Sequence, residues 1–132
     1  MIESKIVSKI NSELHKLENF NGIIGFLVIG TNGLTITSFL PSNIDEKSVG
    51  ALSTSIFEAL EAASSEINDE LINVTVEYDD IQLIMIKINE NALLGVFTEL
   101  NIDFGLLLIE LEELIENINS VIGGNENSNK RR

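Results

Sequence analysis

Few residues in this sequence combine a type and a spacing that could do chemistry. The segment Gly25 to Asn32 (GFLVIGTN) has glycines five positions apart, as a phosphate-binding loop does. However, Thr31 and Asn32 stand where such a loop needs Lys and Ser or Thr, and the residues between the glycines are typical of a strand. No backbone amides would be free to hold a phosphate. We therefore interpret Gly25 and Gly95 as positions of close packing or strand bulges.

Carboxylates near the C-terminus are the next candidates. Glu110 with Glu113, and Glu112 with Glu116, have the spacing that places two side chains on one helix face. Such pairs could bind a divalent cation, but a solvated acidic helix face is the simpler interpretation. No calcium-loop pattern of alternating acidic residues around a glycine occurs.

The remaining catalytic options are removed by composition. The chain has no cysteine, which excludes disulfides, thiolate nucleophiles and nearly every structural zinc site. Its one histidine, His15, lies outside the apolar stripe of a predicted helix, so a Ser-His-Asp arrangement has no support. Asp79 and Asp80 are better interpreted as a turn than as an acid–base pair. We expect a non-catalytic protein without cofactor or metal.

Charge and hydrophobicity narrow the class of protein further. The 132 residues include 21 acidic and eight basic side chains, a net charge of −13, which should repel nucleic acid. Both arginines, Arg131 and Arg132, are the last two residues, so the expected folded body has no guanidinium. The longest apolar run, Gly22 to Gly30, is far shorter than the roughly 20 residues that span a bilayer. With no signal-peptide pattern at the N-terminus, we expect a cytoplasmic protein without membrane insertion.

Hydrophobic periodicity predicts the order helix, two strands, helix, three strands, helix. The expected helices are residues 2–20, a segment from a cap within 42–46 to about 68, and 103–122; the expected strands are 23–29, 34–40, 72–78, 81–88 and 92–100. Strands 34–40 and 72–78 alternate polar and apolar residues and should be edges, whereas the other three are apolar on both faces. This pattern predicts an α/β protein of α+β type, with a five-stranded, mostly antiparallel sheet and helices on both faces. Residues 1–122 should form one domain, because Gly123 and Gly124 are expected to end the last helix and 123–132 to form a disordered polar tail.

The second helix has two distinct sides. Its apolar stripe, expected to face the core, comprises Val49, Leu52, Ile56, Leu60, Ala63 and Ile67. The opposite side carries small residues, which would let another backbone approach closely.

The predicted strand 72–78 is an unprotected edge. It carries no proline or lysine, and only Glu77 opposes pairing with another strand. A twofold partner could pair with this strand and pack against the second helix at the same time. We therefore predict a homodimer with a continuous sheet, whose interface comprises Ala51, Ser55, Glu58, Ala62, Asn73, Val74, Thr75, Val76 and Glu77.

Over residues 5–122 the sequence resembles the Roadblock/dynein light chain family. The resemblance is carried by the element order and by five segments: Ile24–Val28 (IGFLV), Thr31–Ile36 (TNGLTI), the small-residue helix Val49–Ala63, Ala92–Phe97 (ALLGVF) and Asp103–Leu107 (DFGLL). The resemblance implies a dimeric platform that binds and regulates a Ras-like small GTPase, as a homodimer or with a paralogous Roadblock chain. A bacterial member that regulates cell polarity stimulates its GTPase partner.

The resemblance also implies a docking surface on the outward side of the second helix. Its candidate residues are Thr54, Phe57, Glu58, Glu61 and Ser65. Because the folded body lacks arginine, it cannot supply an arginine finger, and any stimulation would reposition the GTPase's own residues. Two alternatives stay open: a small-molecule sensor domain of PAS or profilin-like type, and a subunit of a larger trafficking or motor scaffold that does not regulate a GTPase.

Overall fold

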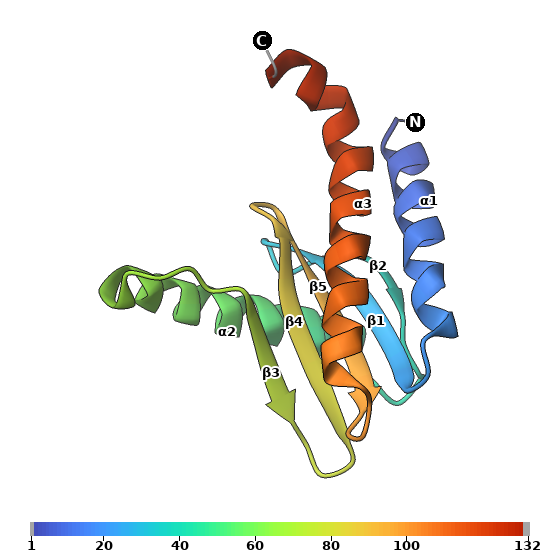
Figure 1. The fold of residues 1–132 in the computed structure, drawn as a ribbon, viewed down its shortest axis with the longest axis vertical. Helices are drawn as coiled ribbons and strands as arrows, with labels where there is room; N and C mark the ends of the chain where they lie inside the picture. Colours follow the sequence, from blue (N-terminus) through green and yellow to red (C-terminus); the bar gives the residue numbers. More distant parts are fainter. Residues whose placement is uncertain (1, 131–132) are drawn as a thin grey trace. The chain divides into compact units, whose positions relative to one another are not determined.

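The order of helices and strands agrees with the order predicted from the sequence. A computed structural model describes the backbone of residues 2–130 and the side chains of residues 4–122. The elements are α1 (Ile2–Leu14), the 3-10 helix η1 (His15–Asn19), β1 (Ile23–Gly30), β2 (Thr35–Phe39), α2 (Glu46–Ile67), β3 (Asn73–Glu77), β4 (Ile81–Asn89), β5 (Ala92–Glu99) and α3 (Phe104–Lys130) (Figure 1). They form two compact units, one of residues 2–22 with 101–130 and one of residues 23–100.

The five strands form one antiparallel sheet in the order β2-β1-β5-β4-β3. The two strands that alternate polar and apolar residues are the edges, as predicted. The Asn32–Gly33 turn joins β1 to β2, and Gly33 has the positive φ of 86° that such a turn requires. The Asp79–Asp80 turn joins β3 to β4, where the Tyr78 N–H donates to the Ile81 carbonyl over 2.8 Å.

Both strand glycines occupy positions of close packing, as expected. A Cβ at Gly25 would lie 2.7 Å from the Phe39 carbonyl oxygen, next to a register shift in the β1–β5 ladder. A Cβ at Gly95 would lie 2.9 Å from Leu27 Cδ2. The segment that resembles a phosphate loop is therefore part of a paired strand.

Helix α2 packs on the sheet through an unexpectedly narrow face. Its buried residues are Gly50, Ser53, Thr54 and Phe57, and Phe57 joins a core cluster with residues of β1, β4 and β5. A Cβ at Gly50 would lie 2.9 Å from the Gly33 carbonyl oxygen, so the glycine allows the helix to touch the β1–β2 turn.

The expectation that the apolar stripe of α2 faces the core is therefore wrong. Leu52 is 62% exposed and Ile67 70% exposed, and Ile56 and Leu60 are exposed too. The physical reason is that the small side chains of Gly50 and Ser53, together with Phe57, bring the helix closer to the sheet than larger side chains would allow.

In the other unit, α1 packs against α3. Ile10 and Leu14 of α1 are buried, as are Leu111 and Ile118 of α3. The Asp103 carboxylate accepts a 3.1 Å hydrogen bond from the Leu106 N–H, which confirms the predicted helix cap.

Helix α3 continues to Lys130, past the end predicted at Gly123 and Gly124. A glycine within a helix costs only about 1 kcal/mol relative to alanine, so a glycine pair does not by itself end a helix. Residues 131–132 of the predicted tail lie outside the described residues.

Candidate functional site: a groove beside helix α2 and the edge of strand β3

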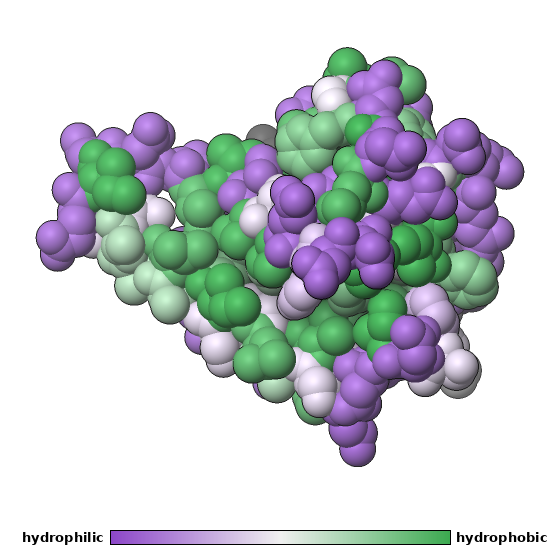
Figure 2. Space-filling view, turned by 90° about the horizontal axis from the view of Figure 1, so that it is seen from below, coloured by the Kyte–Doolittle hydropathy of each residue, from purple (hydrophilic) through white to green (hydrophobic). Residues whose placement is uncertain are grey.

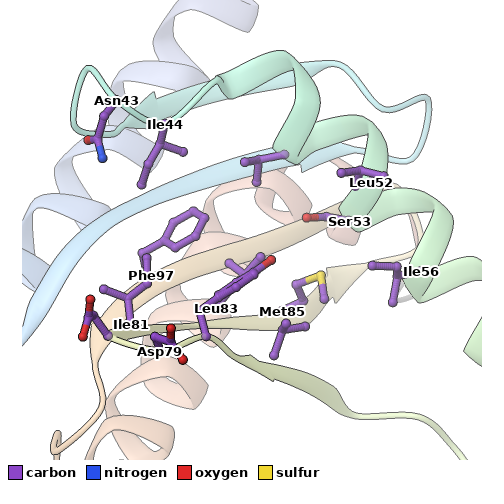
Figure 3. Close-up of a pocket in the computed structure, with 14 residues that line it drawn as sticks. Asn43, Ile44, Leu52, Ser53, Ile56, Asp79, Ile81, Leu83, Met85 and Phe97 are labelled. Carbon is purple, nitrogen blue, oxygen red and sulfur yellow. The ribbon is translucent and has the colours of Figure 1, made fainter.

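A groove of about 730 Å³ separates one flank of α2 from the sheet (Figure 3). The helix side supplies side chains of the exposed stripe, and the sheet side supplies buried apolar side chains such as Leu83, Met85 and Phe97 (Figure 3). The full lining is Asn43, Ile44, Val49, Leu52, Ser53, Ile56, Val76, Tyr78, Asp79, Asp80, Ile81, Leu83, Met85 and Phe97. The groove thus leaves two apolar surfaces facing each other with nothing between them.

Its polar groups do not suggest catalysis. The only carboxylates in the lining are Asp79 and Asp80 of the β3–β4 turn, and no cationic side chain lines it. Among the described residues, no group of three or more His, Cys, Asp or Glu side chains is placed to hold a metal ion. An apolar surface of this kind suits an apolar partner.

Strand β3 borders the groove and forms the free edge of the sheet. It pairs with β4 without any register shift over its five residues. All five β3 residues predicted for the homodimer interface, Asn73 to Glu77, therefore lie together on one regular edge.

The four predicted helix residues do not lie on the groove side. Ala51, Ser55, Glu58 and Ala62 are exposed, but none of them lines the groove. The structure therefore separates the helix half of the predicted interface from the groove beside β3. The groove-lining stripe residues Leu52 and Ile56 take their place.

Two of the predicted docking residues are wrong because they are buried. Thr54 is 7% exposed and donates a 2.9 Å hydrogen bond to the Gly50 carbonyl, which returns its hydroxyl to the helix backbone. Phe57 is 2% exposed and is part of the core. Neither side chain can contact a partner that docks on the surface. Ser65, like Glu58, is exposed.

Glu61, the remaining docking candidate, forms an ion pair within the chain. Its Oε2 lies 2.7 Å from Lys87 Nζ, and Glu90 lies 3.4 Å from the same amine. The hydrogen bond to Glu61, with a smaller contribution from Glu90, raises the pKa of Lys87 above its usual 10.5. The ion pair ties the middle of α2 to β4.

The exposed stripe of α2 was missed because apolar residues at helical spacing predict burial without naming the partner. A second pattern in the sequence could have found it. Gly50, Ser53 and Phe57 recur at intervals of three and four residues, which marks a narrow face suited to close packing on a sheet.

The Roadblock/LC7 domain family matches residues 9–98, and the chain belongs to this family. The Methanocaldococcus jannaschii protein MJ0714 is 32% identical over 117 residues, which covers 88% of this chain and 98% of that protein. A second protein of the same organism, MJ1340, is 31% identical over 117 residues, with 88% and 99% covered. The predicted family resemblance is thus confirmed.

The fold is also that of solved MglB structures. Myxococcus xanthus MglB superposes with a TM-score of 0.80 at 20% identity, covering 88% of this chain and 96% of that one. A structure described as MglB with tetrameric arrangement gives a TM-score of 0.78 at 14% identity, covering 88% and 89%. These matches confirm the predicted α+β fold. In the described part of the chain, no helix has both the length and the hydrophobicity needed to cross a membrane.

Proposed function

We propose that this protein is a non-catalytic platform that acts as a dimer and binds a Ras-like small GTPase in the cytoplasm. The observation that carries the proposal is the exposed apolar stripe of α2 beside the free edge of β3. Leu52 and Ile67 are each more than half exposed in the single chain. Apolar side chains that line up next to an unpaired strand are typical of an interface between proteins.

The arrangement of α2 and the sheet supports a twofold partner. The C-terminal end of α2 projects past β3 (Figure 1). A band of hydrophobic side chains begins near that end of the helix, at the left of Figure 2. A second copy joined at the β3 edge would receive the projecting end of the helix over its own sheet and would cover the band.

The GTPase part of the proposal rests on membership of the Roadblock/LC7 family. Of the predicted docking residues, Glu58, Glu61 and Ser65 remain available on α2. Residues 2–130 contain no arginine, so stimulation of hydrolysis would act through the GTPase's own residues.

A small-molecule sensor is the second candidate, because the groove volume of about 730 Å³ falls in the range of ligand pockets. A dimer would fill the groove with protein side chains, whereas a sensor would keep it open. Native mass spectrometry separates the two: a bound small molecule on a monomer favours the sensor, and an empty dimer favours the platform.

The direct test combines oligomeric state with GTPase binding. Analytical ultracentrifugation should give a dimer at tens of micromolar, and a monomer there would refute the proposal. Calorimetry with the purified Ras-like GTPases of the same organism, loaded with GDP or a non-hydrolysable GTP analogue, should show binding that prefers one nucleotide. A dimer that binds none of them in either state would leave a scaffold subunit without GTPase regulation.

A matched pair of charge reversals tests the docking surface. Glu58→Lys should weaken GTPase binding at least fivefold, because it reverses a charge on the proposed docking flank. Glu66→Lys makes the same change in charge elsewhere on α2, where the side chain is also exposed, and should alter binding less than twofold. Equal effects of the two substitutions would argue against this flank.

A further inference from the structure

The free edge of β3 presents a defined set of backbone groups. The Tyr78 N–H bonds to Ile81 of β4, so the backbone of Tyr78 faces β4. Because alternate residues of a strand point their backbone groups in the same direction, Val76 and Val74 also face β4. Asn73, Thr75 and Glu77 therefore direct their N–H and C=O groups outward, away from the sheet.

The other edge of the sheet is less suited to pairing. The β1–β2 ladder shifts register between Val28 and Ile29, so the backbone of β2 is irregular where a new strand would have to pair. Irregularities of this kind blunt an edge, and β3 has none.

Self-pairing of β3 has one favoured register. In an antiparallel pair centred on Thr75, all three outward-facing residues of each strand oppose outward-facing residues, which allows about six backbone hydrogen bonds. A shift of the centre by one residue in either direction leaves only about four within the strand. The five-residue strand has Thr75 as its midpoint, so its own length selects this register.

The side chains favour the same register. With Thr75 at the centre, Glu77 lies opposite Asn73, whose amide can donate a hydrogen bond to the carboxylate. In a register centred on Glu77, two carboxylates would lie directly opposite each other, which destabilises a sheet. The charged residue that opposes strand pairing in the sequence thus acts to select one alignment.

We propose that two copies of this chain pair β3 with β3 in antiparallel register centred on Thr75, so that Asn73 of one protomer lies opposite Glu77 of the partner subunit. The inference rests on the dimer of the proposed function and specifies how each copy recognises the other. A twofold axis through Thr75, perpendicular to the sheet, keeps both α2 helices on the same face.

The same axis closes the groove. The Glu61–Lys87 ion pair ties α2 to β4 beyond Ile86, the residue paired with Asn73, so the helix lies toward the Asn73 end of β3. The groove lies toward the other end of β3, where Val76 and the turn after it line the groove. The axis exchanges these two ends, so it places the α2 of the partner subunit over the groove and sets the two exposed stripes against each other.

The absence of cysteine makes the register directly measurable, because a single introduced cysteine has no competitor. Thr75→Cys, Asn73→Cys and Glu77→Cys are treated with a short bis-maleimide and compared on a denaturing gel. In the proposed register, the two copies of residue 75 have Cα atoms about 5.5 Å apart, whereas those of residues 73 and 77 are about 14 to 15 Å apart. Thr75→Cys should cross-link at least tenfold faster than the other two, which should react at similar rates.

Glu90→Cys supplies the background rate of random collision, since Glu90 lies in the β4–β5 turn with 87% of its side chain exposed. Fastest cross-linking at residue 73 or 77, or no rate above that background, overturns the register. If ultracentrifugation still gives a dimer, the proposed function survives that outcome. A monomer overturns both.

A charge change at Asn73 provides an independent readout. Asn73→Lys places a cation opposite Glu77 of the partner subunit and should tighten the dimer. Asn73→Asp places two carboxylates opposite each other, twice per dimer, and should weaken it. The two dissociation constants should differ at least tenfold at low salt, and equal values would refute the Asn73–Glu77 pairing.

Discussion

The exposed stripe of α2 allows a quantitative test of the dimer through Leu52. This side chain lines the groove and is 62% exposed in the single chain. Leu52→Ser removes most of its apolar surface while leaving the core contacts of Phe57, on another side of the helix, in place. The substitution should therefore act on the association and only weakly on the fold.

The magnitude follows from the area that a partner would cover. Complete burial of a leucine side chain stabilises by about 1.5 to 3 kcal/mol, and 62% exposure leaves about 1 to 2 kcal/mol of this unrealised in the single chain. Twofold symmetry removes the contact twice, so the dimer should lose about 2 to 4 kcal/mol. At 1.4 kcal/mol for each factor of ten, the dissociation constant should rise by about 30-fold to 700-fold.

Sedimentation velocity over a dilution series measures this constant, and Ile109→Ser is the matched control. Ile109 lies on α3 and is also 62% exposed, so its substitution removes a similar exposed apolar side chain outside the groove. The control should change the dissociation constant less than threefold. Equal effects of the two substitutions, or no effect of Leu52→Ser, would refute the assignment of the stripe to the interface.

Three further predictions concern the fold. Phe57→Ala should lower the free energy of unfolding by about 3 to 5 kcal/mol, measured by urea denaturation at fixed protein concentration, because it empties a fully buried site. Lys87→Met should cost about 0.5 to 1 kcal/mol below pH 10.5, since the raised pKa of Lys87 means that its pairing with Glu61 stabilises the charged form; the cost should vanish as pH rises through that raised pKa in alkaline urea titrations. The Ser48 hydroxyl lowers the pKa of Asp45 below 3.8, so Asp45→Asn should be less stable than the wild type at pH 7, and the gap should close as pH falls below 3.8, as followed by thermal melts across pH.

Local rules predict much of this fold. The turns at Asn32–Gly33 and Asp79–Asp80, the cap at Asp103 and the division into edge and central strands depend on a few neighbouring residues and on the period-two pattern of each strand. The end of α3 was mispredicted because the cost of Gly123 and Gly124 is small and competes with the rest of a long helix.

The candidate site was predicted only in part. The β3 edge could be identified because the sequence of that strand alternates and lacks proline and lysine. The helix side could not, because an apolar stripe on α2 is equally compatible with a core and with a partner. Thr54 and Phe57 show the same difficulty, since their positions relative to the sheet depend on how the helix is rotated about its axis.

The sequence by itself determined the class of this protein: an acidic chain without cysteine, with both arginines at its end and a helix and strand pattern of the Roadblock type. Only the tertiary structure decided which side of α2 is left for a partner. The physical reason is that a helix rotates to bring its closest-packing side chains, here Gly50, Ser53 and Phe57, against the sheet. This rotation leaves Leu52 and Ile56 facing an open groove.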